Sequence, residues 1–90
     1  MNPQKEIRQI YVGGLNARKV KDIKRFFSKF GKVRDVCMKK RFCFVEFKNY
    51  QDAHDACDIM NGHDLFGDRV TVELAKSTKA RLFRRLNQLN

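Results

Sequence analysis

Residues 40–47 read Lys-Arg-Phe-Cys-Phe-Val-Glu-Phe, and they are the most informative segment of the chain for predicting its fold. Aromatic and β-branched residues fill it, which is typical of a β-strand. Side chains in a strand alternate between two faces, so Phe42 and Phe44 share one face, while Cys43 and Val45 lie on the other. Both faces are therefore apolar, and the aromatic face requires an explanation if it is not part of the core.

Hydrophobic periodicity predicts three more strands and two helices around this stretch. Apolar residues alternate with polar ones in residues 9–15, 33–38 and 69–74, as expected for strands, and the break at Arg34-Asp35 suggests a bulge. Apolar residues recur three and four apart in residues 19–29 and 52–60, as expected for helices. Asn49 is a candidate N-cap of the second helix and Gly31 a candidate C-cap of the first, and residues 64–67 predict a turn or short hairpin.

The resulting order predicts an α+β fold of the ferredoxin-like βαββαβ type. Its four-stranded antiparallel sheet carries both helices on one face. The side chains expected to face the helices are Ile10, Val12, Cys43, Val45, Phe47, Val70, Val72 and Leu74. Those expected on the open face are Tyr11, Gly13, Phe42, Phe44, Glu46, Thr71 and Glu73.

Three aromatic rings on an open sheet face are costly to expose to water. Stacking of unpaired nucleic acid bases explains them, since each stacked base contributes roughly 1 to 3 kcal/mol. Cover by another part of the same chain is the alternative explanation.

The charge of the chain also favours a polyanionic partner. Twenty Lys and Arg stand against ten Asp and Glu, a net charge of +10. Five of the acids lie in residues 49–68, which contain no Lys or Arg, so the rest of the chain is strongly basic.

No apolar run is long enough for a membrane helix, and the N-terminus does not read as a secretory signal. The three cysteines are expected to be free thiols, and their spacing predicts no metal site or other cofactor.

Two motifs resemble those of the RNA recognition motif. Residues 10–15, Ile-Tyr-Val-Gly-Gly-Leu, are similar to the family's strand-one signature, and residues 40–47 to its strand-three signature. Arg41 stands where the family usually has Gly, and Cys43 where it has Gly or Ala. The resemblance implies an RNA recognition motif over residues 9–76.

The resemblance also implies roles for individual residues. Tyr11 and Phe44 would stack two consecutive bases of single-stranded RNA, Phe42 would contact the sugars between them, and Lys40 would contact a phosphate. The remaining expected RNA-binding residues are Lys39, Arg41, Gly13, Asn16, Glu46, Thr71, Glu73 and Lys76. No general base stands out, so the chain is expected to be a monomeric binding domain and not an enzyme.

Residues 26–36 resemble the first such domain of serine/arginine-rich splicing factors, as does the short connection between the second and third strands. This implies nuclear localisation, with the cytoplasm as a second compartment, and a role in pre-mRNA splicing or mRNA processing. Splicing-related proteins would then bind the helices or the basic tail. No Arg-Ser repeat occurs in the 90 residues.

The segments outside the predicted domain are an N-terminal extension, residues 1–8, and a basic C-terminal segment, residues 77–90. Ser77-Thr78 could cap a C-terminal helix with apolar residues along one side. Such a helix could cover the sheet, bind phosphates or dock a protein, whereas an isolated helix of this length would be only marginally stable.

The main alternative function is a protein interaction module on the same fold. Such modules resemble one another in an acidic first helix and an Arg-x-Phe loop before the last strand. Here residues 19–29 are basic and residues 64–68 lack that element, so the sequence disfavours this alternative.

Overall fold

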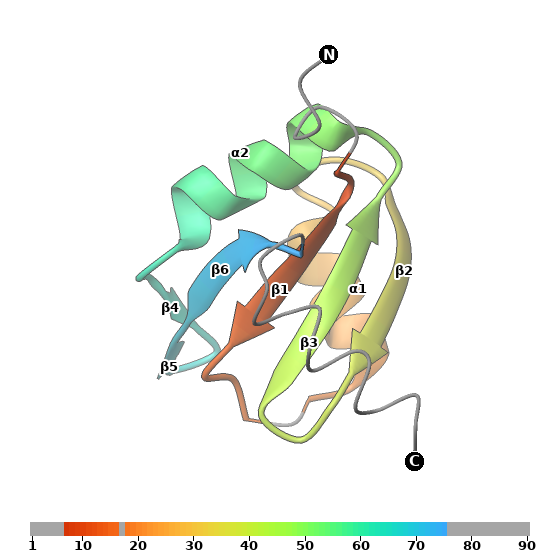
Figure 1. The fold of residues 1–90 in the computed structure, drawn as a ribbon. Helices are drawn as coiled ribbons and strands as arrows, with labels where there is room; N and C mark the ends of the chain where they lie inside the picture. Colours follow the sequence, from red (N-terminus) through yellow and green to blue (C-terminus); the bar gives the residue numbers. More distant parts are fainter. Residues whose placement is uncertain (1–6, 17, 76–90) are drawn as a thin grey trace.

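The computed structural model describes residues 7–16 and 18–75, and its elements follow the predicted order (Figure 1). In chain order they are β1 (Gln9–Gly13), α1 (Val20–Phe27), β2 (Val33–Met38), β3 (Phe42–Phe47), α2 (Tyr50–Met60), β4 (Asp64–Leu65), β5 (Asp68–Arg69) and β6 (Thr71–Leu74).

β1, β2, β3 and β6 form one antiparallel sheet in the order β2-β3-β1-β6. The two signature segments thus become the two central strands, and they lie side by side. α1 packs against β2, while α2 packs against β6, β1 and β3, so one face of the sheet carries both helices (Figure 1). The predicted ferredoxin-like fold is confirmed.

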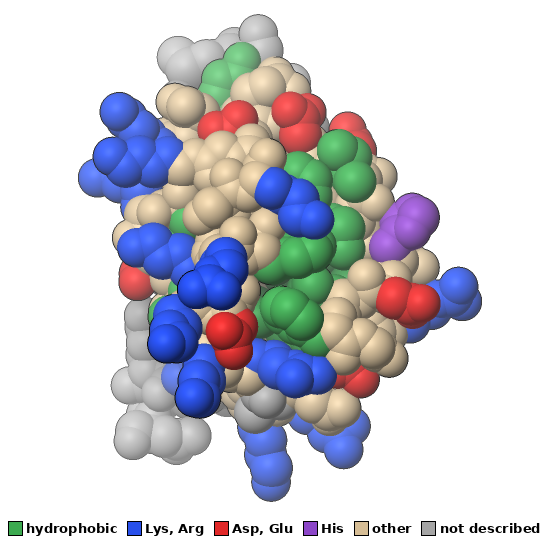
Figure 2. Space-filling model, turned by 180° about the vertical axis from the view of Figure 1, so that it is seen from behind, with side chains coloured by type: hydrophobic (Ala, Val, Ile, Leu, Met, Phe, Trp, Pro, Cys, Tyr) green, Lys and Arg blue, Asp and Glu red, His purple; other side chains and the backbone are tan. Residues whose placement is uncertain are grey.

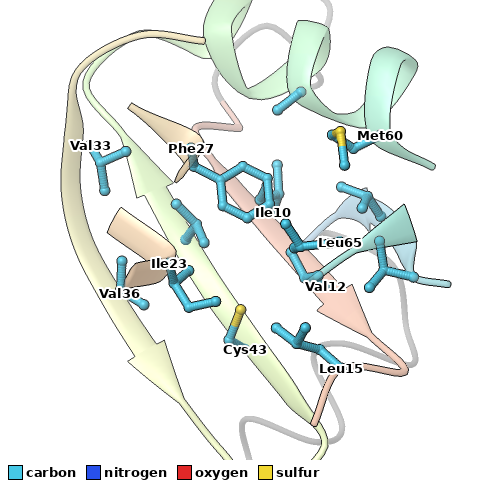
Figure 3. Close-up of a cluster of buried hydrophobic side chains, with 14 of the residues drawn as sticks. Ile10, Val12, Leu15, Ile23, Phe27, Val33, Val36, Cys43, Met60 and Leu65 are labelled. Carbon is cyan, nitrogen blue, oxygen red and sulfur yellow. The ribbon is translucent and has the colours of Figure 1, made fainter. Parts of the chain in front are cut away.

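The main core lies between the sheet and the helices (Figure 3). α1 contributes Ile23 and Phe27, and α2 contributes Ala53 and Ala56, all fully buried. The small alanine side chains let α2 approach the strands closely, while the phenylalanine fills the space under α1. All eight side chains predicted to face the helices belong to this core, although Leu74 is only partly buried.

The predicted bulge in β2 is present. The register with β3 shifts between Val33 and Asp35, so Val33 and Val36 both face the helices. An extra residue in one strand changes which side chains share a face. As a result Asp35 lies opposite Glu46, on the open side of the sheet.

Of the two predicted helix caps, Asn49 is confirmed as the N-cap of α2 and Gly31 is wrong as the C-cap of α1. α1 ends at Phe27 with Ser28 as its C-cap, so Gly31 lies beyond the helix. The Ser28 hydroxyl donates to the Lys24 carbonyl at 2.6 Å, and the same carbonyl accepts from the Ser28 N–H at 2.9 Å. Asn49 does occupy the N-cap position of α2, but its side chain makes no capping hydrogen bond.

The last predicted strand is interrupted. Val70 separates β5 from β6, and it pairs with the segment that follows α2. Its N–H donates to the His63 carbonyl at 3.0 Å, and its carbonyl accepts from the Gly62 N–H at 2.8 Å. The predicted hairpin after α2 is present as β4 and β5.

Candidate nucleic-acid interface

The strand register arranges the open face of the sheet as three rows of side chains. The middle row crosses all four strands and contains Cys37, Phe44, Tyr11 and Glu73. The row nearer the β2–β3 turn contains Phe42, Gly13 and Thr71. The row on the other side contains Asp35, Glu46 and Gln9. All seven residues predicted for the open face therefore lie on it.

Three aromatic rings form a cluster at the centre of this face, which we call the aromatic platform: Tyr11, Phe42 and Phe44. The Tyr11 ring centroid lies 5.7 Å from that of Phe42 and 5.8 Å from that of Phe44. The Phe42 and Phe44 centroids are 5.8 Å apart with ring planes at 87°. These separations are typical of favourable aromatic pairs, so the rings hold one another in place.

Gly13 determines where the Tyr11 ring lies. A Cβ atom on Gly13 would be 2.6 Å from the Tyr11 hydroxyl oxygen and 2.7 Å from its Cε1. The ring therefore leans along β1 and covers the glycine. Glycine in a strand costs about 0.5 to 1 kcal/mol relative to alanine. Its absent side chain is what makes room for the platform.

The platform is less exposed than the sequence predicts. Tyr11 exposes 7% of its surface and Phe44 only 2%, and both pack with Ala75, which follows β6 and is 8% exposed. The alternation of side chains along a strand correctly predicted that these rings lie on the open face of the sheet. It could not predict their exposure, because alternation does not show which atoms cover a side chain. A base can stack on Tyr11 or Phe44 only after the atoms above the ring move.

The phenol of Tyr11 stays neutral at physiological pH. Burial raises its pKa, and the nearby Glu73 and Cys43 raise it further. An uncharged ring does not repel the phosphates of a bound strand, which is what a stacking residue requires.

The turn from Lys39 to Arg41 puts positive charge beside the platform. Lys40 and Arg41 are exposed, and Lys39 is partly buried. The Arg41 carbonyl accepts hydrogen bonds from the N–H groups of Gly14 and Leu15, each at 3.1 Å, which ties the turn to the end of β1. Cations held at the edge of the aromatic rows are suited to contact phosphates.

Two other predicted site residues are not brought to the platform by the described structure. The Asn16 backbone N–H and Nδ2 both donate to the Asp68 carboxylate at 3.1 Å, so these donors are used within the protein. Lys76 lies outside the described residues.

Sequence reasoning missed two residues of the open face. The bulge in β2 puts Asp35 opposite Glu46 and Cys37 opposite Phe44. Counting the alternation back from Met38 would have found both, because Val36 and Met38 share the helix-facing side. The open face thus carries three carboxylates, since Glu73 lies on it as well.

The described residues contain no group of three or more His, Cys, Asp or Glu side chains placed to hold a metal ion. Burial raises the pKa of the Cys43 and Cys57 thiols to about 12, so neither is a ready nucleophile. No helix in the described part of the chain is long and apolar enough to cross a membrane.

A family model for the RNA recognition motif matches residues 10–71, from the second residue of β1 to the first residue of β6. The chain belongs to the RNA recognition motif family. The match includes both signature segments, and with them every ring of the aromatic platform.

The chain is similar to parts of several serine/arginine-rich proteins, two of which are named as splicing factors. It is 45% identical over 71 residues to serine-arginine protein 55 of Drosophila melanogaster and 45% identical over 69 residues to serine/arginine-rich splicing factor RS2Z32 of Arabidopsis thaliana. It is 41% identical over 70 residues to serine/arginine-rich splicing factor 5 of Homo sapiens. These matches cover 76 to 78% of this chain but only 19 to 26% of the relatives. The resemblance to serine/arginine-rich proteins inferred from the sequence is confirmed.

Solved structures share the fold at lower identity. The third RNA recognition motif of Mip6 superposes with a TM-score of 0.73 and 19% identity, covering 81% of this chain and 99% of that one. The RNA recognition motif of Rna15 with bound RNA (GU) superposes with a TM-score of 0.71 and 18% identity, covering 87% of this chain and 96% of that one.

Proposed function

We propose that this domain binds single-stranded RNA by stacking two consecutive bases on Tyr11 and Phe44. The observation that carries the proposal is the convergence of three aromatic rings on the two central strands, at the family's signature positions. Adjacent strands lie about 4.8 Å apart. Rings on β1 and β3 are therefore close enough to serve neighbouring bases of one strand.

The surrounding residues supply the other contacts that RNA requires. Lys39, Lys40 and Arg41 contact phosphates at the edge of the platform, and Phe42 packs against the sugars. Thr71, Glu46 and Glu73 lie beside the rings and read base edges. Phosphate contacts position the strand, while base contacts select its sequence.

The domain acts in pre-mRNA splicing or mRNA processing in the nucleus. Relatives at 41 to 45% identity are named as serine/arginine-rich proteins and splicing factors, which supports this role. The net charge of +10 opposes self-association, which supports a monomeric domain.

The test is equilibrium binding to a randomised single-stranded RNA at two salt concentrations. The variant is Tyr11→Leu with Phe44→Leu, because leucine keeps the buried site apolar while it removes the π-face. The expected loss is roughly 2 kcal/mol, about thirtyfold, at both salts. Gln51→Ala, at an exposed position of α2, is the control that should bind as the wild type does.

A double leucine variant that folds and binds RNA as the wild type does would contradict the proposal. If its affinity also collapsed at the higher salt, the basic residues would be holding phosphates without help from the platform.

A further inference from the structure

A second aromatic cluster lies on the opposite side of the molecule from the platform. Phe26 of α1 is at its centre, with ring centroids 5.9 Å from Phe66 and 6.2 Å from Phe30. Arg18 and Lys29 border these rings, and we call the five residues the Phe66 patch. Figure 2 views the molecule from the helix side, where hydrophobic side chains gather at the centre of a surface dotted with Lys and Arg.

Phe66 occupies an unfavourable backbone position. It joins β4 to β5 together with Gly67, and both have positive φ, 53° and 88°. Two-residue hairpin turns of this kind favour Asn-Gly, because a bulky side chain in the left-handed region costs roughly 1 to 2 kcal/mol. The Phe66 side chain is nevertheless 38% exposed. Its contact with Phe26 offsets part of the strain, and more than a third of the residue's surface remains exposed.

Two cations are fixed against the aromatic rings. The Arg18 guanidinium lies 5.1 Å from the Phe66 ring centroid, and its Nη2 donates to the Phe66 carbonyl at 2.9 Å. The Lys29 ammonium lies 4.0 Å from the Phe26 centroid and 5.9 Å from that of Phe30. Each cation retains further N–H donors for a partner.

The surroundings of the patch are positively charged on the α1 side, while Asp64 and Asp68 flank Phe66 in its turn. The exposed basic residues on α1 and its flanks are Lys19, Lys21, Lys24, Arg25 and Lys32. Asp22 is the only acid between residues 18 and 32. This field attracts negatively charged partners, of which RNA and acidic polypeptides are the two main classes.

The cations on the rings favour a polypeptide over RNA. The Arg18 guanidinium lies over the Phe66 ring and the Lys29 ammonium over the Phe26 ring, so one face of each ring is already occupied by a side chain instead of being open to a base. An apolar centre with arginine and aromatic residues, inside a charged rim, is the composition that protein interfaces favour.

We propose that the Phe66 patch docks an acidic polypeptide segment of another protein. The segment places one bulky apolar side chain on Phe26 and Phe66, and its carboxylates pair with Arg18 and Lys29. The basic residues on and around α1 give this surface the opposite charge to that of interaction modules with an acidic first helix. Because the patch and the platform lie on opposite sides of the sheet, the domain can hold RNA and this partner together.

The test uses a synthetic twelve-residue peptide of Asp and Glu with one central Trp, titrated into the full chain and followed by NMR. We expect shifts of the amide signals of Arg18, Phe26, Lys29 and Phe66, and none at Tyr11 or Phe44. A matched peptide with Ser in place of Trp should bind about tenfold more weakly, since the apolar anchor is lost.

Two variants are designed to change the Phe66 patch without disrupting the fold. Phe66→Asn removes the ring, while asparagine tolerates the left-handed backbone of the turn. Lys29→Glu reverses an exposed charge in the turn that follows α1. Each should weaken the acidic peptide about tenfold or more and leave RNA affinity unchanged, so failure of the patch is distinguishable from failure of RNA binding.

Several outcomes would overturn the proposal. If the Ser peptide bound as tightly as the Trp peptide, charge attraction alone would account for binding and the apolar anchor would play no part. Peptide-induced shifts at Tyr11 and Phe44, or affinity unchanged in Phe66→Asn, would place the peptide elsewhere. Shifts at the patch that depend on protein concentration without peptide would make a second copy the occupant, and shifts there on adding RNA would make it an RNA contact.

Discussion

Replacing Gly13 with alanine should damage RNA binding more than it damages the fold. The added Cβ would lie 2.6 Å from the Tyr11 hydroxyl oxygen, whereas ordinary contact begins at 3.4 Å, so the ring must retreat by about 0.8 Å. The displaced ring presses on Phe42 and Phe44, with which it is packed. Such overpacking costs roughly 1 to 3 kcal/mol.

The net change in stability is smaller than this strain. Alanine restricts the unfolded chain and stabilises a strand by about 0.5 to 1 kcal/mol relative to glycine. We therefore expect Gly13→Ala to lower the free energy of unfolding by about 1 kcal/mol. Misplacing the Tyr11 ring removes the contact of one stacked base, so RNA affinity should fall by roughly 1 to 3 kcal/mol, about 5- to 150-fold.

The assay pairs fluorescence anisotropy on a labelled single-stranded RNA with urea unfolding, for the wild type, Gly13→Ala and the control Gln51→Ala. NMR contacts of the Tyr11 ring verify that it has moved. If the ring moves and RNA affinity is unchanged, Tyr11 does not stack a base. If the ring stays in place, the inferred collision with residue 13 is wrong.

The remaining predictions concern charge, the tail and the thiols. Lys40→Ala should weaken binding to all RNA sequences alike and reduce the slope of log K against log salt by about one, since one phosphate contact is lost; an unchanged slope would remove Lys40 from the interface. Residues 77–90 lie outside the described structure, but the chain leaves β6 at Ala75 within the platform cluster, so we hypothesise that they compete with RNA for this face. Deleting them should raise RNA affinity, and a fall or no change would refute the competition. At pH 8 a thiol reagent should label exposed Cys37 in the folded protein, whereas buried Cys43 should react only on unfolding; equal rates would contradict its burial. The pKa of Cys43 is raised from 9.0 to about 12, so the folded state keeps its proton after the unfolded state has lost it; the free energy of unfolding should fall as pH rises from 9 towards 12, and by less in Cys43→Ala.

Much of the candidate site followed from local patterns. The alternation around Tyr11 and Phe44 predicted their common face, because side-chain direction in a strand depends only on position along it. The same rule located Glu46, Thr71 and Glu73. Asn16 shows its limit, because its role depends on Asp68, 52 residues away, and no period relates the two.

The Phe66 patch could not be predicted in the same way. The loop of residues 64–68 lacks an arginine, so its sequence gave no sign of a cation beside Phe66. The structure supplies that cation as Arg18, from the other end of the domain sequence. Likewise, no pattern in the chain indicated the positive φ of Phe66, since turns of this kind favour Asn or Gly there.

The order of the elements, the helix-facing sides of β1, β3 and β6, and the family could be read from the amino-acid sequence alone, because these depend on periods of two and 3.6 residues and on two short motifs. The burial of Tyr11 and Phe44, the cover of Gly13 by the Tyr11 ring and the contacts of Phe66 with Phe26 and Arg18 became known only from the folded domain. The physical reason is that exposure and ring contacts depend on which atoms from distant segments fill the space above a side chain, and the local chain does not encode its neighbours.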